Sequence, residues 1–429
     1  MTWRTPSDAA TRTLLTERID LERQGVGMVV GVIEPDGRRV VAHGSTGRGE
    51  GVGLDGDTVF EIGSITKAFT ALVLADMARR GEVALDDPAA LYLPEGVTLP
   101  ERGGRRITLT DLATHTSGLP RRPNNLTPTD PPNLYDGYTA QQLYACLASC
   151  ELRHDIGAAH LYSNLGTGLL GHLLARRAGV DFGTLVRERI TGPLGMPDTG
   201  IALSPGQAAR FATPHDQSLR PVSGFGLGVL AGAGALRSTG ADLLTFLAAL
   251  LGDSETSLAP ALAVQLSVRR PTAGDDVQAL GWRISDEIVF HHGATRGHRC
   301  FLQFDPVRRA GVVVLTNTAS ARNDDLGFHL LSGRPLTPPA PAFSAASLAG
   351  FPGRYRFSAR AGLDIERQRG RLFARMTRQD WFELLPVGDA EVRWASADAR
   401  ATLAARPDGH ITGLVLRQDG RELRGTREG

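Results

Sequence analysis

Two strand patterns enclose a helical region in the first 330 residues. The segment VGMVVGVIEPDGRRVVAHG at 26–44 has two apolar runs separated by Asp36-Gly37, a dipeptide typical of hairpin turns. CFLQFDPVRRAGVVVLTNTA at 300–319 predicts a second hairpin. Apolar residues at helical spacing predict helices in ITKAFTALVLADMARRG, NLGTGLLGHLLARRAG and TGADLLTFLAALLG between them. We therefore expect an α+β domain whose sheet joins the first and last portions of this region.

A different pattern follows a proline-rich run. RPLTPPAPAFSA at 334–345 is typical of a semi-rigid extended spacer. After it, short apolar segments alternate with turn signals such as RQRG, RPDG and RQDG, which indicates an antiparallel sheet or barrel. The predicted organisation is one domain over 1–333, a linker over 334–348 and a small all-β, barrel-like domain over 349–429.

Composition and charge exclude several classes of function. With 47 basic and 46 acidic residues the formal net charge is +1, so nothing suggests nucleic acid or an acidic membrane as partner. Cys146, Cys150 and Cys300 have no zinc or disulfide spacing and are expected to be buried thiols. No cofactor is implied, and the sequence leaves the oligomeric state open.

The N-terminal segment predicts an amphipathic helix. Residues 1–25 lack the basic start and apolar run of a signal peptide. No stretch approaches the roughly 20 apolar residues that a membrane span needs. The chain is expected to be cytoplasmic unless a leader has been removed.

Lys67 is the only lysine of the chain, since the other 46 basic residues are arginine. It lies in GSITKAFT at 63–70, three residues after Ser64 and after an apparent strand, TVFEIG. Side chains three apart share one helical face, with Cβ atoms about 5 to 6 Å apart. That separation lets a lysine take the proton of a serine nucleophile.

The chemistry of a base explains why arginine does not replace this lysine. Lowering a lysine pKa by about 3 units costs about 4 kcal/mol, whereas neutralising an arginine would cost about 8 kcal/mol. The second cost rivals the whole stability of a domain, about 5 to 15 kcal/mol. A chance survivor on a helix surface is the alternative interpretation.

Two further segments supply partners for this pair. LYSNLG at 161–166 precedes an apolar helix, and it offers Tyr162 as a proton shuttle and Asn164 to position a lysine or a substrate carbonyl. Taken alone, Tyr162 also suits a packed core. VFHHGATRGH at 289–298 offers a strand, the pair His291 and His292, and small residues such as Gly293 that let a substrate backbone approach. A metal site at His291, His292 and His298 has no acidic cluster or helical pair to support it.

SITK at 64–67, YSN at 162–164 and HHG at 291–293 resemble the three ordered motifs of the serine β-lactamase and penicillin-binding-protein superfamily. The similarity is closest to its class C-like branch, which includes DD-peptidases, D-amino-acid peptidases and family VIII carboxylesterases. DLATHTSGLP at 111–120 and ITGPLGMPDTG at 190–200 are also similar to stretches of that branch. The resemblance spans roughly residues 10–330 and implies a β-lactamase-like fold, followed here by a lipocalin-like C-terminal domain.

The resemblance also implies roles for individual residues. Ser64 would be the nucleophile, Lys67 its base, Tyr162 the proton shuttle to the leaving group and Asn164 a positioning residue. The backbone N–H groups of Ser64 and Ala294 would form the oxyanion hole, next to Gly293. His291 stands where β-lactamases usually have the lysine of KTG. Because histidine is largely neutral at pH 7, this departure lowers the expectation of strong β-lactamase activity.

Three functions remain open from the sequence. The first is a metal-independent serine hydrolase that forms an acyl-enzyme with small esters, amides, D-amino-acid peptides or, weakly, β-lactams. The second is an acyltransferase or peptide-cyclising thioesterase that uses the same acyl-enzyme. The third is a binding or sensing module that acylates without turnover. The proline- and asparagine-rich segment 121–139 predicts a loop that would shape the substrate pocket.

Overall fold

The computed structural model describes residues 3–49, 53–127, 133–319 and 323–428. The chain forms two compact units. The larger contains residues 1–214 and 223–336, and the smaller contains 215–222 and 337–429. No helix in the described part of the chain is long and apolar enough to cross a membrane.

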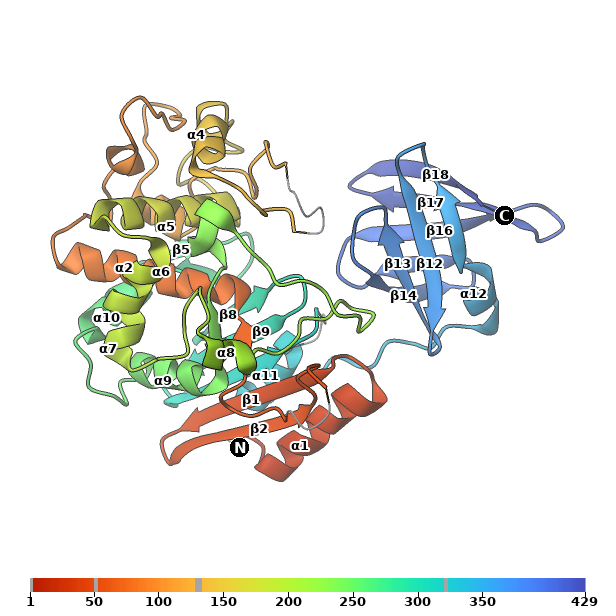
Figure 1. Ribbon diagram of the computed structural model, residues 1–429, viewed down its shortest axis with the longest axis horizontal. Coiled ribbons are helices and arrows are strands. Elements are labelled where there is room, and N and C mark those ends of the chain that lie inside the picture. The colour runs from red at the N-terminus through yellow and green to blue at the C-terminus, as the bar shows by residue number, and fades with distance from the viewer. Residues whose placement is uncertain (1–2, 50–52, 128–132, 320–322, 429) are drawn as a thin grey trace. The chain divides into compact units, whose positions relative to one another are not determined.

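The larger unit contains an eight-stranded antiparallel sheet that joins the first and last portions of its sequence (Figure 1). Both predicted hairpins are present, with Glu34 opposite Gly37 in one and Asp305 opposite Ala310 in the other. In spatial order the strands are β2 (Gly37–Gly44), β1 (Gly27–Glu34), β10 (Ala310–Thr316), β9 (Arg299–Asp305), β8 (Ile288–Ala294), β7 (Trp282–Ser285), β6 (Val277–Ala279) and β5 (Arg270–Pro271).

The apolar strands are buried on both faces, which explains their nearly continuous hydrophobic runs. In β1, Val29 and Ile33 belong to a core that includes α9 (Gly240–Leu250). The alternate residues Met28, Val30 and Val32 belong to a second core with α1 (Asp8–Thr16) and α11 (Asn323–Ser332).

The helical part of the larger unit surrounds α2 (Thr66–Arg79), which is buried continuously from Thr66 to Met77. The three helices expected between the hairpins correspond to α2, α5 (Asn164–Ala178) and α9. The remaining α-helices of this region are α3 (Leu109–Ala113), α4 (Ala140–Ala148), α6 (Phe182–Val186), α7 (Gly192–Leu194), α8 (Pro205–Ala209) and α10 (Ala259–Ser267). Cys146, Cys150 and Cys300 are free and buried, as expected.

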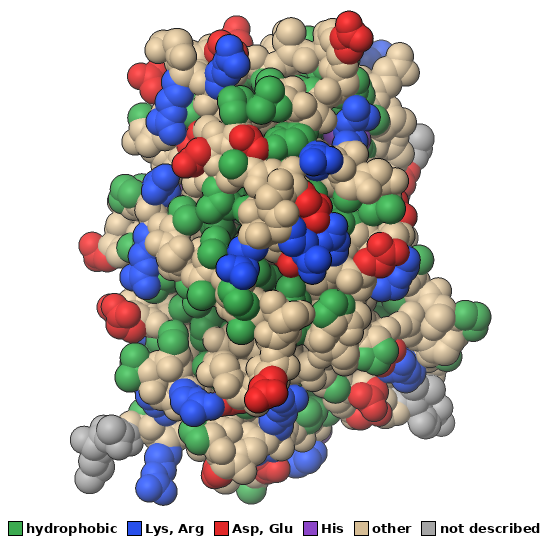
Figure 2. Space-filling view, turned by 90° about the vertical axis from the view of Figure 1, so that its left-hand side faces the viewer, with side chains coloured by type: hydrophobic (Ala, Val, Ile, Leu, Met, Phe, Trp, Pro, Cys, Tyr) green, Lys and Arg blue, Asp and Glu red, His purple; other side chains and the backbone are tan. Residues whose placement is uncertain are grey.

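One face of the molecule is shown in Figure 2, where basic and acidic side chains are interspersed among apolar ones. This mixture agrees with the balanced composition and the net charge of +1.

The smaller unit is a closed antiparallel barrel of eight strands in sequence order. Its core includes Tyr355, Leu372 and Trp394. The strands are β11 (Gly353–Arg356), β12 (Gly362–Gln368), β13 (Arg371–Met376), β14 (Phe382–Gly388), β15 (Glu391–Trp394), β16 (Ala399–Ala405), β17 (Ile411–Gln418) and β18 (Arg421–Arg427). The predicted α+β fold followed by an all-β barrel is confirmed.

Two features of the smaller unit were not predicted. The segment predicted as a linker, 334–348, contains the start of α12 (Ala345–Gly350), because Ser344 caps that helix by accepting from Ser347 N. Residues 215–222, from the middle of the chain, also belong to this unit. There the Arg220 guanidinium lies 4.8 Å from the centroid of the Trp381 ring.

Candidate active site

Ser64 and Lys67 lie where a short strand meets the central helix. β3 (Val59–Glu61) pairs with β4 (Arg237–Thr239) and leads into the 3₁₀ turn η2 (Gly63–Ile65), which α2 follows directly. Ser64 therefore lies in a 3₁₀ turn before the α-helix, and residues three apart in such a turn are eclipsed. Lys67 Nζ lies 3.0 Å from Ser64 Oγ. The predicted proximity of the Ser64 and Lys67 side chains is present.

The Lys67 amine has two polar contacts besides Ser64, and both fit a neutral amine. Nζ donates to Asn164 Oδ1 at 2.9 Å and to the carbonyl oxygen of Ala233. Both oxygens can only accept. A neutral amine has two N–H groups and one lone pair, so these two carbonyls occupy both N–H groups. The lone pair is then free to accept the proton of the Ser64 hydroxyl.

Burial favours this neutral form of Lys67. The side chain is 0% exposed, and burial together with the positive charge of Arg121 holds the pKa of Lys67 well below its ordinary value. Among the described residues, no ion pair joins Lys67 to a carboxylate. The geometry and the electrostatics both fit a general base.

Tyr162 lies beside the pair, and Lys67 Nζ is 4.9 Å from its ring centroid. Burial raises the pKa of Tyr162 to about 12, while Ser64 and Arg121 act in the opposite direction. The phenol therefore keeps its proton at neutral pH, which suits a proton donor to a leaving group.

Asn164 connects Lys67 to a second tyrosine. It is the first residue of α5, where the side chain of Ser163 caps the helix. While its Oδ1 accepts from Lys67, its Nδ2 donates to the hydroxyl of Tyr135 at 3.1 Å. The amide is thereby held with its oxygen toward the amine.

The third motif lies on β8, inside the sheet between β9 and β7. A Cβ atom on Gly293 would lie 1.9 Å from the carbonyl oxygen of Ile62. A Cβ atom on Gly63 would lie 2.7 Å from the backbone N of Ala294. Two glycines thus allow β8 to approach the backbone that carries Ser64, which brings the two predicted oxyanion donors, Ser64 and Ala294, into one region.

His291 shares a face of β8 with Val289, which packs in the core that contains α2. Its Nδ1 lies 2.8 Å from the carbonyl oxygen of His292. Burial, which is the largest cause, holds the pKa of His291 well below its ordinary value, and the neighbouring His292 acts in the same direction. The imidazole is therefore neutral at pH 7, which argues against a cationic role in holding an anionic substrate.

The histidines of this segment have separate surroundings. His292 Nδ1 lies 3.8 Å from Asp324, whereas His298 Nδ1 lies 3.3 Å from the buried carboxylate of Glu61. Within the ranges that the structure describes, no group of three or more His, Cys, Asp or Glu side chains could hold a metal ion.

The DLATHTSGLP segment holds the second motif in place. The backbone carbonyl oxygen of His115 accepts a hydrogen bond from Leu161 N at 2.8 Å. The ring Nδ1 of His115 accepts a second hydrogen bond, from Ser163 N at 3.2 Å. Ser163 Oγ donates to the carbonyl oxygen of Pro120 at 2.7 Å. The His115 ring centroid is 4.5 Å from that of Tyr162. Residues 115–120 thus form the wall behind Tyr162.

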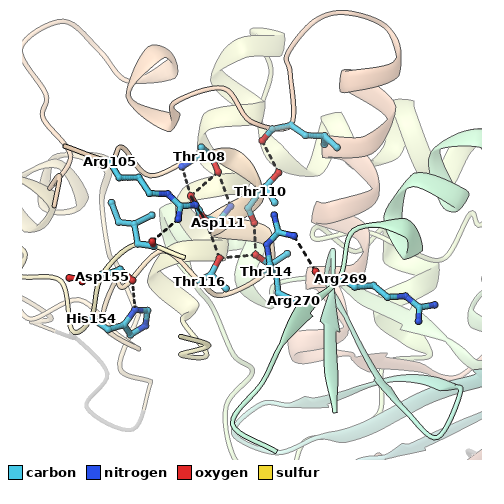
Figure 3. Close-up of polar contacts among 12 residues, drawn as sticks. Arg105, Thr108, Thr110, Asp111, Thr114, Thr116, His154, Asp155, Arg269 and Arg270 are labelled. Atoms are coloured by element: carbon cyan, nitrogen blue, oxygen red, sulfur yellow. Dashed lines mark hydrogen bonds and ion pairs between the residues drawn. The ribbon is translucent and has the colours of Figure 1, made fainter. Parts of the chain in front are cut away.

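Asp111 anchors this wall (Figure 3). Its buried carboxylate accepts from Thr108 N at 3.0 Å, which completes the capping box of α3. The carboxylate also accepts hydrogen bonds from Thr116 Oγ1 at 3.1 Å and from Arg105 Nη2 at 3.1 Å. The acidic residue of the motif therefore fixes the turn that carries His115.

Sequence reasoning missed several residues of this site. Tyr135, Ala233 and Arg121 lie outside the three short motifs, and the contact of Ala233 is made by its backbone, which leaves no signal in the side chain. Arg121 and Tyr135 lie in segment 121–139, which was predicted to shape the pocket, and Asp111 and His115 lie in DLATHTSGLP, but none of these four was named as a site residue. In the predicted loop 121–139, residues 128–132 lie outside the described part of the chain.

Comparison with known proteins identifies the family. A family model described as Beta-lactamase matches residues 10–331. The chain belongs to the beta-lactamase family. The resemblance to the serine β-lactamase and penicillin-binding-protein superfamily is thus confirmed, and with it membership of a family of serine hydrolases.

Two relatives by sequence are similar over part of this beta-lactamase family chain. "D-alanyl-D-alanine-carboxypeptidase/endopeptidase AmpH" of Escherichia coli (strain K12) is 34% identical over 227 residues, which cover 52% of this chain and 56% of the relative. "Putative beta-lactamase-like 1" of Homo sapiens is 33% identical over 277 residues, 60% of this chain and 54% of the relative. The match covers little more than half the length of either relative.

Solved structures of the family share the fold of the larger unit. A class C beta lactamase from Rhodobacter sphaeroides matches with a TM-score of 0.62 and 27% identity, covering 72% of this chain and 93% of that one. A beta-lactamase/D-alanine carboxypeptidase from Yersinia pestis matches with a TM-score of 0.64 and 26% identity, and the match covers 76% of this chain and 95% of that one.

Proposed function

We propose that this protein is a serine hydrolase that forms an acyl-enzyme at Ser64 with D-alanyl peptides and related small amides and esters. The observation that carries the proposal is the buried Lys67 amine, which lies 3.0 Å from Ser64 Oγ with two carbonyls as its other partners. The substrate class is supported by the similarity to proteins named as D-alanine carboxypeptidases.

In the first step, Ser64 transfers its hydroxyl proton to Lys67 Nζ while Oγ forms a bond to the substrate carbonyl carbon. The carbonyl oxygen becomes an oxyanion that the backbone N–H groups of Ser64 and Ala294 would stabilise. Donors of this kind are typically worth about 10² to 10³ in rate each. The carbonyl carbon is then tetrahedral and bonded to both Ser64 and the leaving group.

Collapse of this intermediate breaks the bond to the leaving nitrogen or oxygen. The phenol of Tyr162 donates its proton to that atom and regains one from the Lys67 ammonium, so the proton of Ser64 leaves with the product. Water then attacks the Ser64 ester while Lys67 accepts a proton from it. The bond between Ser64 Oγ and the carbonyl carbon breaks as Lys67 returns that proton to Oγ, which releases the acid and restores the free enzyme.

The experiment that tests the proposal combines mass spectrometry with turnover. The full chain is incubated with an acyl-D-alanyl-D-alanine peptide, nitrophenyl esters and nitrocefin, beside Ser64→Ala. We expect an acyl adduct on Ser64, release of D-alanine, and loss of both in the variant. A wild-type protein that is not labelled at Ser64 by a fluorophosphonate or a β-lactam would contradict the proposal.

The same experiment separates hydrolysis from the two alternative uses of an acyl-enzyme. Product release in water without an added amine or alcohol indicates hydrolysis, whereas dependence on such an acceptor indicates acyl transfer. One equivalent of product without further turnover indicates a binding or sensing module.

A further inference from the structure

Arg121 follows the wall of residues 115–120 and lies next to the second motif. Its carbonyl oxygen accepts from Asn164 N at 3.0 Å and from Leu165 N at 3.4 Å, which anchors its backbone at the start of α5. Its side chain is exposed, and the guanidinium carbon lies 5.2 Å from the centroid of the Tyr162 ring. Arg121 thus presents a solvent-accessible cation beside the proposed donor to the leaving group.

The other polar groups of the site carry no lasting positive charge. Lys67 is buried and suited to the neutral state, and burial holds the pKa values of His115 and His291 well below the ordinary value. Arg283, which acts on His291 from a distance, is paired with Asp276 at 2.6 Å.

Arg121 differs from these groups because an arginine stays protonated in proteins. Within the described ranges, no ion pair joins its guanidinium to a carboxylate. The charge acts across the site, since the Arg121 guanidinium helps to lower the pKa of Lys67 and opposes the rise in the pKa of Tyr162.

We propose that Arg121 selects substrates whose leaving group carries a carboxylate, by pairing its guanidinium with that carboxylate beside Tyr162. The proposal rests on the proposed function. In the proposed mechanism Tyr162 gives its proton to the leaving group, so a cation 5.2 Å from the centroid of the Tyr162 ring would be near that group. A guanidinium binds a carboxylate through two parallel hydrogen bonds. Arg121 would therefore supply the positive charge that His291 does not.

Arg122 is a matched control for this assignment. It is the next residue, it is also exposed, and its charge acts on Tyr135. Unlike Arg121, it has no contact with the Tyr162 ring among the described residues. A general effect of surface charge would involve both arginines, whereas a direct pairing involves Arg121 alone.

The test compares an acyl-D-alanyl-D-alanine peptide with its C-terminal carboxamide, which differs by one negative charge. Release of D-alanine or D-alanine amide is measured for the wild-type chain, Arg121→Ala, Arg121→Lys and Arg122→Ala. We expect Arg121→Ala to lower the kcat/KM ratio of carboxylate to carboxamide by about tenfold or more. Arg121→Lys should keep part of the preference, because lysine retains the charge without the fork geometry. Arg122→Ala should leave the ratio unchanged.

Two further measurements make the outcome decisive. In the wild type, the kcat/KM ratio of carboxylate to carboxamide should fall as the ionic strength rises, because salt screens the pairing. In Arg121→Ala the ratio should not change with ionic strength. Protection of Ser64 from a neutral fluorophosphonate by each peptide reports binding even where turnover is slow. An Arg121→Ala ratio within about twofold of the wild type, or an equal loss in Arg122→Ala, would overturn the assignment. Failure of the fluorophosphonate to label wild-type Ser64 would instead refute the proposed function.

Discussion

The carbonyl oxygen of Ala233 accepts a hydrogen bond from the amine of Lys67, although 166 positions separate the two residues. Ala233 ends the short helix η5 (Gly228–Ala233), which packs on α5. That packing depends on glycines, since a Cβ atom on Gly232 would lie 2.9 Å from the Cα of Gly171. A backbone contact between two distant segments therefore orients the proposed base.

Lys67→Arg should abolish acylation. A guanidinium cannot lose its proton in this site, so the Ser64 hydroxyl would have no base. General-base catalysis is typically worth about 10² to 10⁴ in rate, and we expect a loss of that size. The rate of fluorophosphonate labelling of Ser64, followed by mass spectrometry, measures it.

The control for this change is Arg79→Lys at the exposed end of α2. It should label at the parent rate, and a melting curve for each variant separates lost chemistry from lost folding. A Lys67→Arg protein that labels within a few-fold of the parent would contradict the role of Lys67 as base.

The preference for anionic over neutral substrates should not change between pH 6 and pH 8. An imidazolium that held the anion would lose its proton as the pH rises through its pKa, and the preference would fall with it. The pKa of His291 is held well below its ordinary value, which places that titration below this window. Arg121 stays charged throughout. The kcat/KM ratio of the paired peptides as a function of pH is the measurement, and a ratio that declines toward pH 8 would favour His291.

Gly293→Ala should separate β8 from the nucleophile. The added Cβ atom would lie 1.9 Å from the carbonyl oxygen of Ile62, so β8 or the turn before Ser64 must shift. Displacing the Ala294 donor is expected to lower the acylation rate by about 10² or more. Gly274→Ala is the matched control, because a Cβ atom there meets nothing within 4 Å. Equal labelling rates for the two variants would show that the close approach of β8 is unimportant.

Asp111→Ala should destabilise the wall behind Tyr162. The change leaves Thr108 N without its acceptor and removes one of the two hydrogen-bond partners of Thr116 Oγ1, and a donor left unsatisfied costs about 1 to 3 kcal/mol. Urea unfolding measures the loss, and labelling of Ser64 should slow at the same time. Asp155→Ala removes only a surface ion pair with Arg102 and should cost less than about 1 kcal/mol. A larger effect at Asp155 would contradict this account.

A fragment that ends at residue 336 is expected to fold. The two apolar cores of the larger unit include no residue beyond Leu336, and the barrel has a core of its own. Circular dichroism and thermal melting of the fragment test this expectation. The prediction fails if the fragment is insoluble and the full chain melts in one transition.

Much of the fold could be read from local patterns. Asp36-Gly37 places a hairpin turn because its backbone preference is local, and the apolar runs of β1 and β10 match strands buried on both faces. The proline-rich run marks the region where the larger unit ends, although Ser344 starts a helix inside it. The packing of residues 215–222 with Trp381 involves positions far apart in the chain, and no local pattern reports it.

The sequence by itself determined that Ser64 and Lys67 lie within reach of each other, because a spacing of three residues at a helix start brings the two side chains together whatever surrounds them. Tyr162 and Asn164 could be proposed from a motif, but their distances to Lys67 depend on how α5 packs against α2. Only the tertiary structure decided the charge of the site. Burial holds the pKa values of Lys67 and His291 well below their ordinary values, and a loop residue outside the motifs, Arg121, is an exposed cation beside Tyr162. Protonation depends on desolvation and on neighbours distant in sequence, which a linear pattern does not contain.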